Sequence, residues 1–264
     1  MIGVRTLLRR QWRKIYPAWK LPRELKKPLN LAQLRALKLG RNQLYAYSLY
    51  YFDHYLPPAI RAHRRYFAAA GRGYGEDAFH AMWYLLLQES RPASALEIGV
   101  FRGQIITLWK LLSRHFNFAC SIGCVSPFTA AGDTVSQYLK GVDYYEDTLI
   151  SHRHFSLSLP DFCRNFSTEP EARRFIQSRQ WALIYIDGNH DYPVARQDWE
   201  TCSQTLPPGG IMVLDDAALQ TDFQPPCFSN AGHPGPSQVA AEISAAVYQE
   251  IFFVGHNRVF MKRI

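Results

Sequence analysis

Continuous apolar runs alternate with amphipathic stretches over residues 76–264. The runs read SALEIGV at 94–100, FACSIGCV at 118–125, WALIYID at 181–187 and IMVLDD at 211–216. Apolar runs of this length are typical of strands that are buried on both faces of a parallel sheet. Helical patterns lie around them, at 76–90, 104–116, 133–150, 169–179 and from Pro193 to about 205. This alternation predicts an α/β doubly wound domain.

The end of the chain has a different pattern. A helix is expected from Ser237, whose hydroxyl is a suitable N-cap. Two apolar runs, IFFVGH at 251–256 and RVFMKRI at 258–264, then follow with a short turn between them. They predict an antiparallel hairpin at one edge of the sheet.

Charge divides the chain into two parts. Residues 1–75 hold 16 Lys and Arg against two acids, a balance of +14, whereas residues 76–264 hold 14 against 20, a balance of −6. We therefore expect a basic helical extension over 1–75 and a mildly acidic domain over 76–264. Such asymmetry indicates contact with an anionic surface made of phosphates, lipid headgroups or nucleic acid.

Two parts of the extension have distinct patterns. Residues 1–28 carry nine basic side chains, and Pro17, Pro22 and Pro28 predict that they do not form one continuous helix. Residues 31–55 look helical, with six aromatic residues between Tyr45 and Tyr55. We expect these aromatics to pack on the domain, the alternative being a dedicated lipid or nucleic-acid site.

The composition excludes several protein classes. No apolar run reaches the ~18 residues that span a bilayer, and no secretory signal pattern follows the basic N-terminus. Five cysteines, an odd number without CxxC spacing, favour reduced thiols over disulfides or a zinc site. A cytoplasmic protein is therefore expected.

The first predicted strand ends in a glycine-rich loop. The sequence LEIGVFRG places Glu97, Gly99 and Gly103 directly before a helix. Glycines permit close approach of a ligand to the backbone, and a helix N-terminus attracts negative charge. This pattern alone is a weak signal, because glycine turns after strands are common.

Acidic residues end two later strands. Asp187 closes the strand at 181–187, and Asp215 and Asp216 close the strand at 211–216. If these strands are neighbours, three carboxylates meet at one edge, and a hard cation such as Mg²⁺ or Mn²⁺ relieves their repulsion. The alternative is that one aspartate caps a helix and another is solvated. His190, three residues after Asp187, is a candidate general base or an ordinary loop histidine.

Together, LEIGVFRG, IYIDGNHDY and LPPGGIMVLDDA resemble the core of class I S-adenosylmethionine-dependent methyltransferases. The likeness is to the branch with macrolide sugar O-methyltransferases and cephalosporin-hydroxylase-like proteins, over about residues 76–264. It implies a Rossmann-like, mostly parallel seven-stranded sheet. It also implies that the loop with Glu97, Gly99 and Gly103 holds the methionine part of the cofactor. The metal-binding acids of the cation-dependent members map onto Asp187, Asp215 and Asp216.

The second strand departs from the family pattern. Members of the family usually end it in an acid that binds the ribose hydroxyls, whereas Ser126 and Pro127 stand here. A serine forms weaker hydrogen bonds than a carboxylate, and Asp133 is a candidate to compensate. His233 in GHPGPS is a candidate to shape the substrate pocket or a simple turn residue. The aromatic residues Tyr138, Tyr144 and Tyr145 either line an acceptor site or pack in a cap.

The resemblance leads to three functional hypotheses. The first is metal-assisted O-methyl transfer to a hydroxylated small molecule such as a sugar. The second is a non-catalytic binding protein that its basic arm docks on a membrane or polyanion. The third, an RNA-modifying enzyme, is disfavoured because the basic charge is not spread over the predicted catalytic face. A peripheral, salt-sensitive contact with an anionic membrane is expected of residues 1–28, the alternative being an arm that packs on its own acidic body or on that of a dimer partner. A homo-oligomer is compatible with the sequence.

Overall fold

A single seven-stranded sheet organises the protein. The computed structural model describes residues 2–136 and 138–264, and its strands follow the order β3-β2-β1-β4-β5-β7-β6. Strands β1 to β5 are parallel where they pair, while β7 is antiparallel to both β5 and β6. This confirms the predicted α/β fold and the antiparallel hairpin at one edge. The strands are β1 (Ser94–Ile98), β2 (Ser121–Val125), β3 (Asp161–Cys163), β4 (Leu183–Ile186), β5 (Ile211–Leu214), β6 (Tyr248–Val254) and β7 (Asn257–Lys262).

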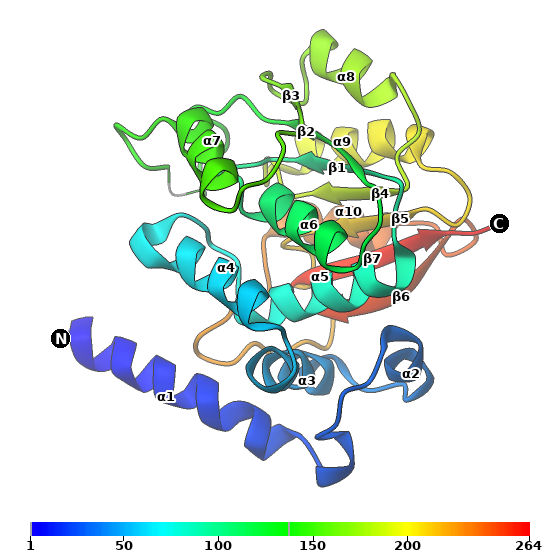
Figure 1. Ribbon diagram of the computed structural model, residues 1–264. Coiled ribbons are helices and arrows are strands. Elements are labelled where there is room, and N and C mark those ends of the chain that lie inside the picture. Colours follow the sequence, from blue (N-terminus) through cyan, green and yellow to red (C-terminus); the bar gives the residue numbers. More distant parts are fainter. Residues whose placement is uncertain (1, 137) are drawn as a thin grey trace.

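Helices cover both faces of the sheet (Figure 1). One face packs against α5 (Asp77–Ser90), α6 (Gln104–His115) and α7 (Tyr144–His154). The other packs against α8 (Pro170–Gln177), α9 (Tyr192–Thr205) and α10 (Pro234–Glu242). Neighbouring residues of β4 illustrate the result, because Leu183 belongs to the first core and Ile184 to the second. Burial on both sides explains why the strands read as continuous apolar runs.

Three local predictions need correction. The helix expected over 133–150 begins only at Tyr144, because Asp143 caps it by accepting a hydrogen bond from the Glu146 backbone N–H. The helix expected from Ser237 begins at Pro234, one turn earlier. Ser237 therefore does not cap it, and its hydroxyl instead donates a hydrogen bond to the backbone carbonyl of Asp216. The three-residue strand β3 was not predicted, since a run so short has no readable period.

The N-terminal helices pack on the same core as the domain. They are α1 (Ile2–Lys20), the 3-10 turn Arg23–Leu25, α2 (Leu31–Ala36), α3 (Arg41–His54), α4 (Pro58–Ala68) and a second 3-10 turn, Ala69–Gly71. Tyr16, Leu25 and Tyr45 all belong to the cluster that also holds α5 and α6. The predicted packing of the aromatic run is confirmed, because Tyr45, Tyr47, Tyr51 and Phe52 are buried.

The prediction that residues 1–28 do not form one continuous helix is confirmed, because α1 ends at Lys20 and Pro22 and Pro28 lie beyond its end. Pro17, however, does not break α1 and lies inside its last turn. It lacks the N–H that would bond to the carbonyl of Arg13, and it is buried against the body of the protein. Among the described residues, no helix has the length and apolar character needed to cross a bilayer.

Candidate active site

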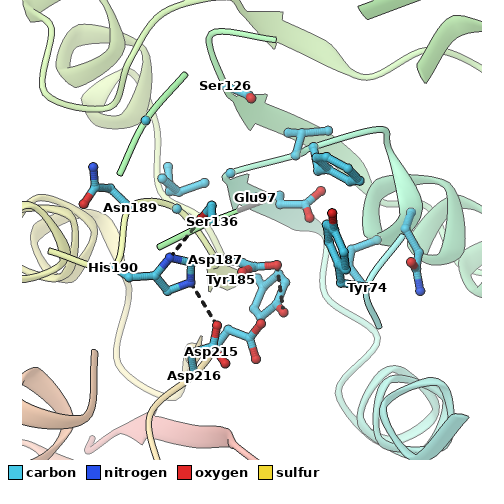
Figure 2. A pocket seen from close by; sticks show the side chains of 18 of the residues that line it. Tyr74, Glu97, Ser126, Ser136, Tyr185, Asp187, Asn189, His190, Asp215 and Asp216 are labelled. Carbon is cyan, nitrogen blue, oxygen red and sulfur yellow. Dashed lines mark hydrogen bonds and ion pairs between the residues drawn. The ribbon is translucent and has the colours of Figure 1, made fainter. Parts of the chain in front are cut away.

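A deep cavity of about 820 Å³ opens where the carboxyl ends of β1, β4 and β5 meet. Figure 2 shows that acidic side chains from these three strands point into it. This is the edge at which ligands bind in doubly wound sheets. The predicted residues Glu97, Gly99, Ser126, Asp187, His190, Asp215 and Asp216 all line the cavity.

The first loop is shaped by two glycines with left-handed backbone angles. Gly99 has φ +88°, and a Cβ added there would lie 1.9 Å from the backbone oxygen of Asp187. Gly103 has φ +85°, and its added Cβ would lie 2.8 Å from Thr148 Cγ2 on α7. Any larger residue would force the strand ends or α7 apart. Gly99 lines the cavity, whereas Gly103, also predicted to bind the cofactor, is not among the lining residues and instead permits the close packing of α7.

Glu97 is a buried acid on β1. Burial raises the pKa of Glu97 well above its ordinary value, and the negative charge of Asp215 adds to the shift. Its Oε2 atom has no hydrogen-bond partner among the described residues. An unpaired buried oxygen that faces a cavity is costly, so Glu97 is suited to a ligand that carries N–H or O–H donors. This fits the amino or hydroxyl groups of S-adenosylmethionine.

Ser126 and Asp133 have different surroundings. Ser126 directly follows β2 and faces the cavity, and its Oγ atom accepts a hydrogen bond of 3.4 Å from the Phe128 backbone N–H. Asp133 accepts hydrogen bonds from the backbone N–H groups of Ser136 (2.6 Å) and His190 (2.9 Å), and its Oδ2 lies 2.5 Å from His190 Nδ1. These contacts favour a role for Asp133 in holding its loop and His190, rather than in binding ribose.

Strands β4 and β5 are adjacent, so Asp187, Asp215 and Asp216 lie at one edge; we call these three residues the carboxylate rim. Burial raises the pKa of Asp187 well above its ordinary value, and the charges of Asp215, Asp216 and Glu97 raise it further. A side-chain hydrogen bond between Asp187 and Asp215 raises the pKa of Asp187 and lowers that of Asp215. Burial also raises the pKa of Asp215 above its ordinary value, so Asp187 and Asp215 hold a proton as a pair.

Histidines surround the other end of the rim. His190 Nε2 lies 2.9 Å from Asp216 Oδ2, and the His190 and His233 rings are 4.3 Å apart. Burial alone would raise the pKa of Asp216, but His190, His256 and His233 together lower it below its ordinary value. Burial would conversely lower the pKa of His190, but Asp216 and Asp133 raise it to about 9.

His256 was missed by the sequence reading. It lies in the β6–β7 turn, with Nε2 3.4 Å from Asp215 Oδ1 and Nδ1 3.4 Å from Asp216 Oδ1. Because β7 is antiparallel to β5, this turn returns the chain to the carboxyl end of β5. The hairpin itself was predicted, and recognising its pairing with β5 would have placed His256 beside the rim.

Two of the rim residues, Asp215 and Asp216, belong to clusters of possible metal ligands, whereas Asp187 belongs to none among the described residues. Carboxylate oxygens are donors that hard cations prefer. Within the described residues, two sets of potential ligands have donor atoms within 4.8 Å of one another. They are His190, Asp216 and His233, and Asp215, Asp216 and His256. Asp216 is common to both sets.

The aromatic residues expected near an acceptor separate into two groups. Tyr138 and Tyr144 line the cavity, together with Phe101. Tyr145 instead packs edge-on against Phe128 and Phe162, with ring centroids 5.4 and 5.1 Å away. Of the two alternatives given for these tyrosines, Tyr145 therefore follows the second, because it packs in the cap and does not line the acceptor site.

Comparison with known proteins identifies the domain. A family model described as a methyltransferase domain matches residues 96–217, which include β1 to β5 and the whole carboxylate rim. Residues 96–217 thus match a methyltransferase domain. This match and the fold support a class I S-adenosylmethionine-dependent methyltransferase. A search of curated proteins gave no match.

Solved methyltransferases share the fold at low sequence identity. An O-methyltransferase from Bacillus cereus in complex with SAH is 14% identical, with a TM-score of 0.56 over 85% of this chain and 100% of that one. TomG, an O-methyltransferase of tomaymycin synthesis from Streptomyces achromogenes in complex with SAM, is 13% identical, with a TM-score of 0.51 over 86% and 100%. At these identities the likeness concerns the fold, and the chemistry rests on the methyltransferase domain and its site.

Proposed function

We propose that this methyltransferase transfers the methyl group of S-adenosylmethionine to a hydroxyl oxygen of a small molecule, with a divalent cation at the carboxylate rim. The carrying observation is the meeting of the Glu97–Gly103 loop and the rim in one cavity. The loop provides a place for the cofactor and the rim a place for the acceptor oxygen. A bound cation would lower the pKa of that hydroxyl and orient it.

The chain supplies the groups that hold such a cation and the acceptor. Asp187, Asp215 and Asp216 are the proposed ligands, with Mg²⁺ or Mn²⁺ as the ion that suits oxygen donors. His233 and His256 lie beside Asp216 and keep its carboxylate ionised. Tyr138, which is half-buried at the cavity, offers a ring on which a sugar or another ring-shaped acceptor would rest, whereas Tyr144 is only 2% exposed.

His190 is the proposed general base. Its Nδ1 faces Asp133, which fixes the ring, and its Nε2 faces the cavity side of Asp216. With a pKa of about 9, the imidazole is protonated at neutral pH while it pairs with the carboxylate of Asp216. A cation bound by Asp216 would lower the pKa of His190, so that the neutral imidazole could accept a proton. Occupation of the rim and activation of the base are therefore coupled.

Calorimetry with S-adenosylmethionine tests the cofactor site. Because Glu97 has an unpaired buried oxygen at the cavity, Glu97→Gln is expected to weaken binding by about tenfold, the loss of roughly one good hydrogen bond. Asp198→Asn on α9 is the matched control, since Asp198 is equally buried but lies outside the cavity lining. Gly99→Val is less informative, because its clash with Asp187 would disturb the fold as well.

The outcomes are distinct. Wild-type protein that binds neither S-adenosylmethionine nor S-adenosylhomocysteine would contradict the proposed function. Full affinity in Glu97→Gln, with wild-type binding intact, would instead show that the cofactor lies elsewhere in the cavity.

A further inference from the structure

Helix α1 has an inner face that is anchored to the protein. Arg13 forms ion pairs with Asp53 (2.6 Å) and Asp77 (2.5 Å), and Tyr16 is buried. The Tyr16 ring packs edge-on against Tyr45, and its hydroxyl accepts a hydrogen bond from Asn42 Nδ2. The helix is thereby held in one orientation beside α3, at the outside of the molecule (Figure 1).

The opposite side of α1 exposes large apolar side chains. Trp12, Ile15 and Trp19 are 51%, 56% and 69% exposed, and we call them the outer face. Their spacing of three and four residues places them on one side of a helix. The remaining four tryptophans of the protein are buried. Exposure of two tryptophans next to an isoleucine is costly and marks an interaction surface.

Basic side chains border this outer face. Lys14 is exposed, and Lys20 Nζ lies 4.3 Å from the ring centroid of Trp19. Residues 1–28 hold nine basic side chains against the single acid Glu24. An exposed apolar stripe with basic flanks is the pattern of a helix that lies in a membrane interface.

We propose that the outer face of α1 docks on an anionic membrane surface. Trp12 and Trp19 would lie at the level of the headgroups, where tryptophan is favoured. Lys14 and Lys20 would reach anionic lipid headgroups. Arg9 lies four residues before Arg13, on the anchored side of the helix, and lines the active-site cavity.

Two other occupants fit the observations less well. A second copy that paired α1 with α1 would bring basic segments together at close range, which is unfavourable. Nucleic acid would satisfy the cations and stack on tryptophan, but it gives no favourable environment for the aliphatic side chain of Ile15. Lipid satisfies all three kinds of side chain at once.

Flotation of the full-length protein with vesicles tests this surface. Wild-type protein is expected to float with vesicles of phosphatidylcholine and phosphatidylglycerol at low salt, and to be released at high salt. The variant Trp12→Ser, Ile15→Ser, Trp19→Ser is expected to partition at least tenfold more weakly. Its matched control replaces three exposed apolar residues elsewhere, Ile150→Ser, Leu159→Ser and Val247→Ser, and should float like the wild type.

Deletion of residues 1–28 is a poor test, because Tyr16, Leu21 and Leu25 belong to the core. Circular dichroism and S-adenosylmethionine calorimetry on the triple variant separate a lost surface from a lost fold, and from failure of the proposed function. Equal flotation of the wild type and the triple variant would overturn the proposal. So would a wild-type protein that stays out of the vesicle fraction while it forms dimers, or binds RNA, through the outer face.

Discussion

The carboxylate rim and the outer face of α1 break the usual pattern of burial in opposite directions. At the rim, Asp187 and Asp215 are acids taken out of water beside one another. On α1, Trp12 and Trp19 are aromatic side chains left in water. Folding alone favours neither arrangement, because a buried charge and an exposed apolar patch both cost free energy.

The two regions differ in what would relieve this cost. The rim lies at the bottom of a cavity and combines negative charge with nearby donors, so a small cation fits it. The outer face is convex, apolar and bordered by positive charge, so an extended anionic surface fits it. Places where local chemistry conflicts with folding are where function is expected.

The substitution Asp187→Asn tests the rim, and its expected loss of Mn²⁺ affinity is the largest effect predicted. Burial and the neighbouring carboxylates raise the pKa of Asp187 well above its ordinary value, and asparagine has nearly the shape of the protonated acid without its charge. The variant should therefore keep the thermal stability of the cation-free protein but bind Mn²⁺ about 100-fold more weakly, measured by electron paramagnetic resonance. Asp198→Asn, at a buried acid outside the cavity lining, should bind Mn²⁺ like the wild type. Equal Mn²⁺ binding by Asp187→Asn and the wild type would remove the rim from the cation site.

Much of this site could be predicted from sequence because strand ends carry strong local signals. Asp187 and Asp215 follow apolar runs directly, and the rule that parallel strands end at one edge brings them together. The same reasoning placed Glu97 and Gly99 at this edge. The strands β1, β4 and β5 are all buried, so each could be recognised as a continuous apolar run. The family resemblance added roles to residues that the topology already grouped.

The remaining features depend on contacts between distant segments. His256 reaches the rim only because β7 pairs with β5, a pairing that hydrophobic pattern does not specify. Asp133 faces His190 through a loop with no periodic signal. The outer face of α1 was hidden for another reason: Pro17 suggested a broken helix, and only the burial of Tyr16 and Arg13 shows which side is free.

A buried histidine pair tests how firmly the N-terminal helices join the domain. His63 on α4 has Nδ1 3.0 Å from His80 Nε2 on α5 and Nε2 2.9 Å from Thr107 Oγ1 on α6. Burial lowers the pKa of His63 to about 3, against about 6.5 when unfolded. The unfolded chain therefore binds the extra proton between these values. The contribution of neutral His63 to the free energy of unfolding is fully present above pH 6.5 and is lost as the pH falls towards 3. The loss is at most about 1.4 kcal/mol per pH unit for this residue.

Urea unfolding between pH 7 and 5 measures this slope. Glutamine cannot be protonated in this range. The His63→Gln variant should therefore unfold at a lower urea concentration at pH 7, but its free energy of unfolding should depend less steeply on pH. His54→Gln, at an exposed histidine of α3, is the control and should follow the wild type. A wild-type slope unchanged by His63→Gln would mean that α4 opens enough to hydrate the pair, and that the extension is joined to the domain less firmly than its core packing indicates.

The smallest expected effect separates the two faces of α1. Arg13→Gln removes the ion pairs with Asp53 and Asp77, and the side chain of Arg13 is 18% exposed, so water compensates only in part. Asp77 keeps a second partner, Arg64, at 3.2 Å. We expect the free energy of unfolding to fall by about 1 kcal/mol, near the upper end for partly solvated pairs. The exposed pair of Arg174 with Glu171 is the control, and Arg174→Gln should change the free energy of unfolding by less than about 0.5 kcal/mol.

Because the outer face is intact in Arg13→Gln, flotation with anionic vesicles should remain within twofold of the wild type. Loss of flotation without loss of stability would place Arg13 itself against the lipid, and the division of α1 into an anchoring face and a docking face would then be wrong.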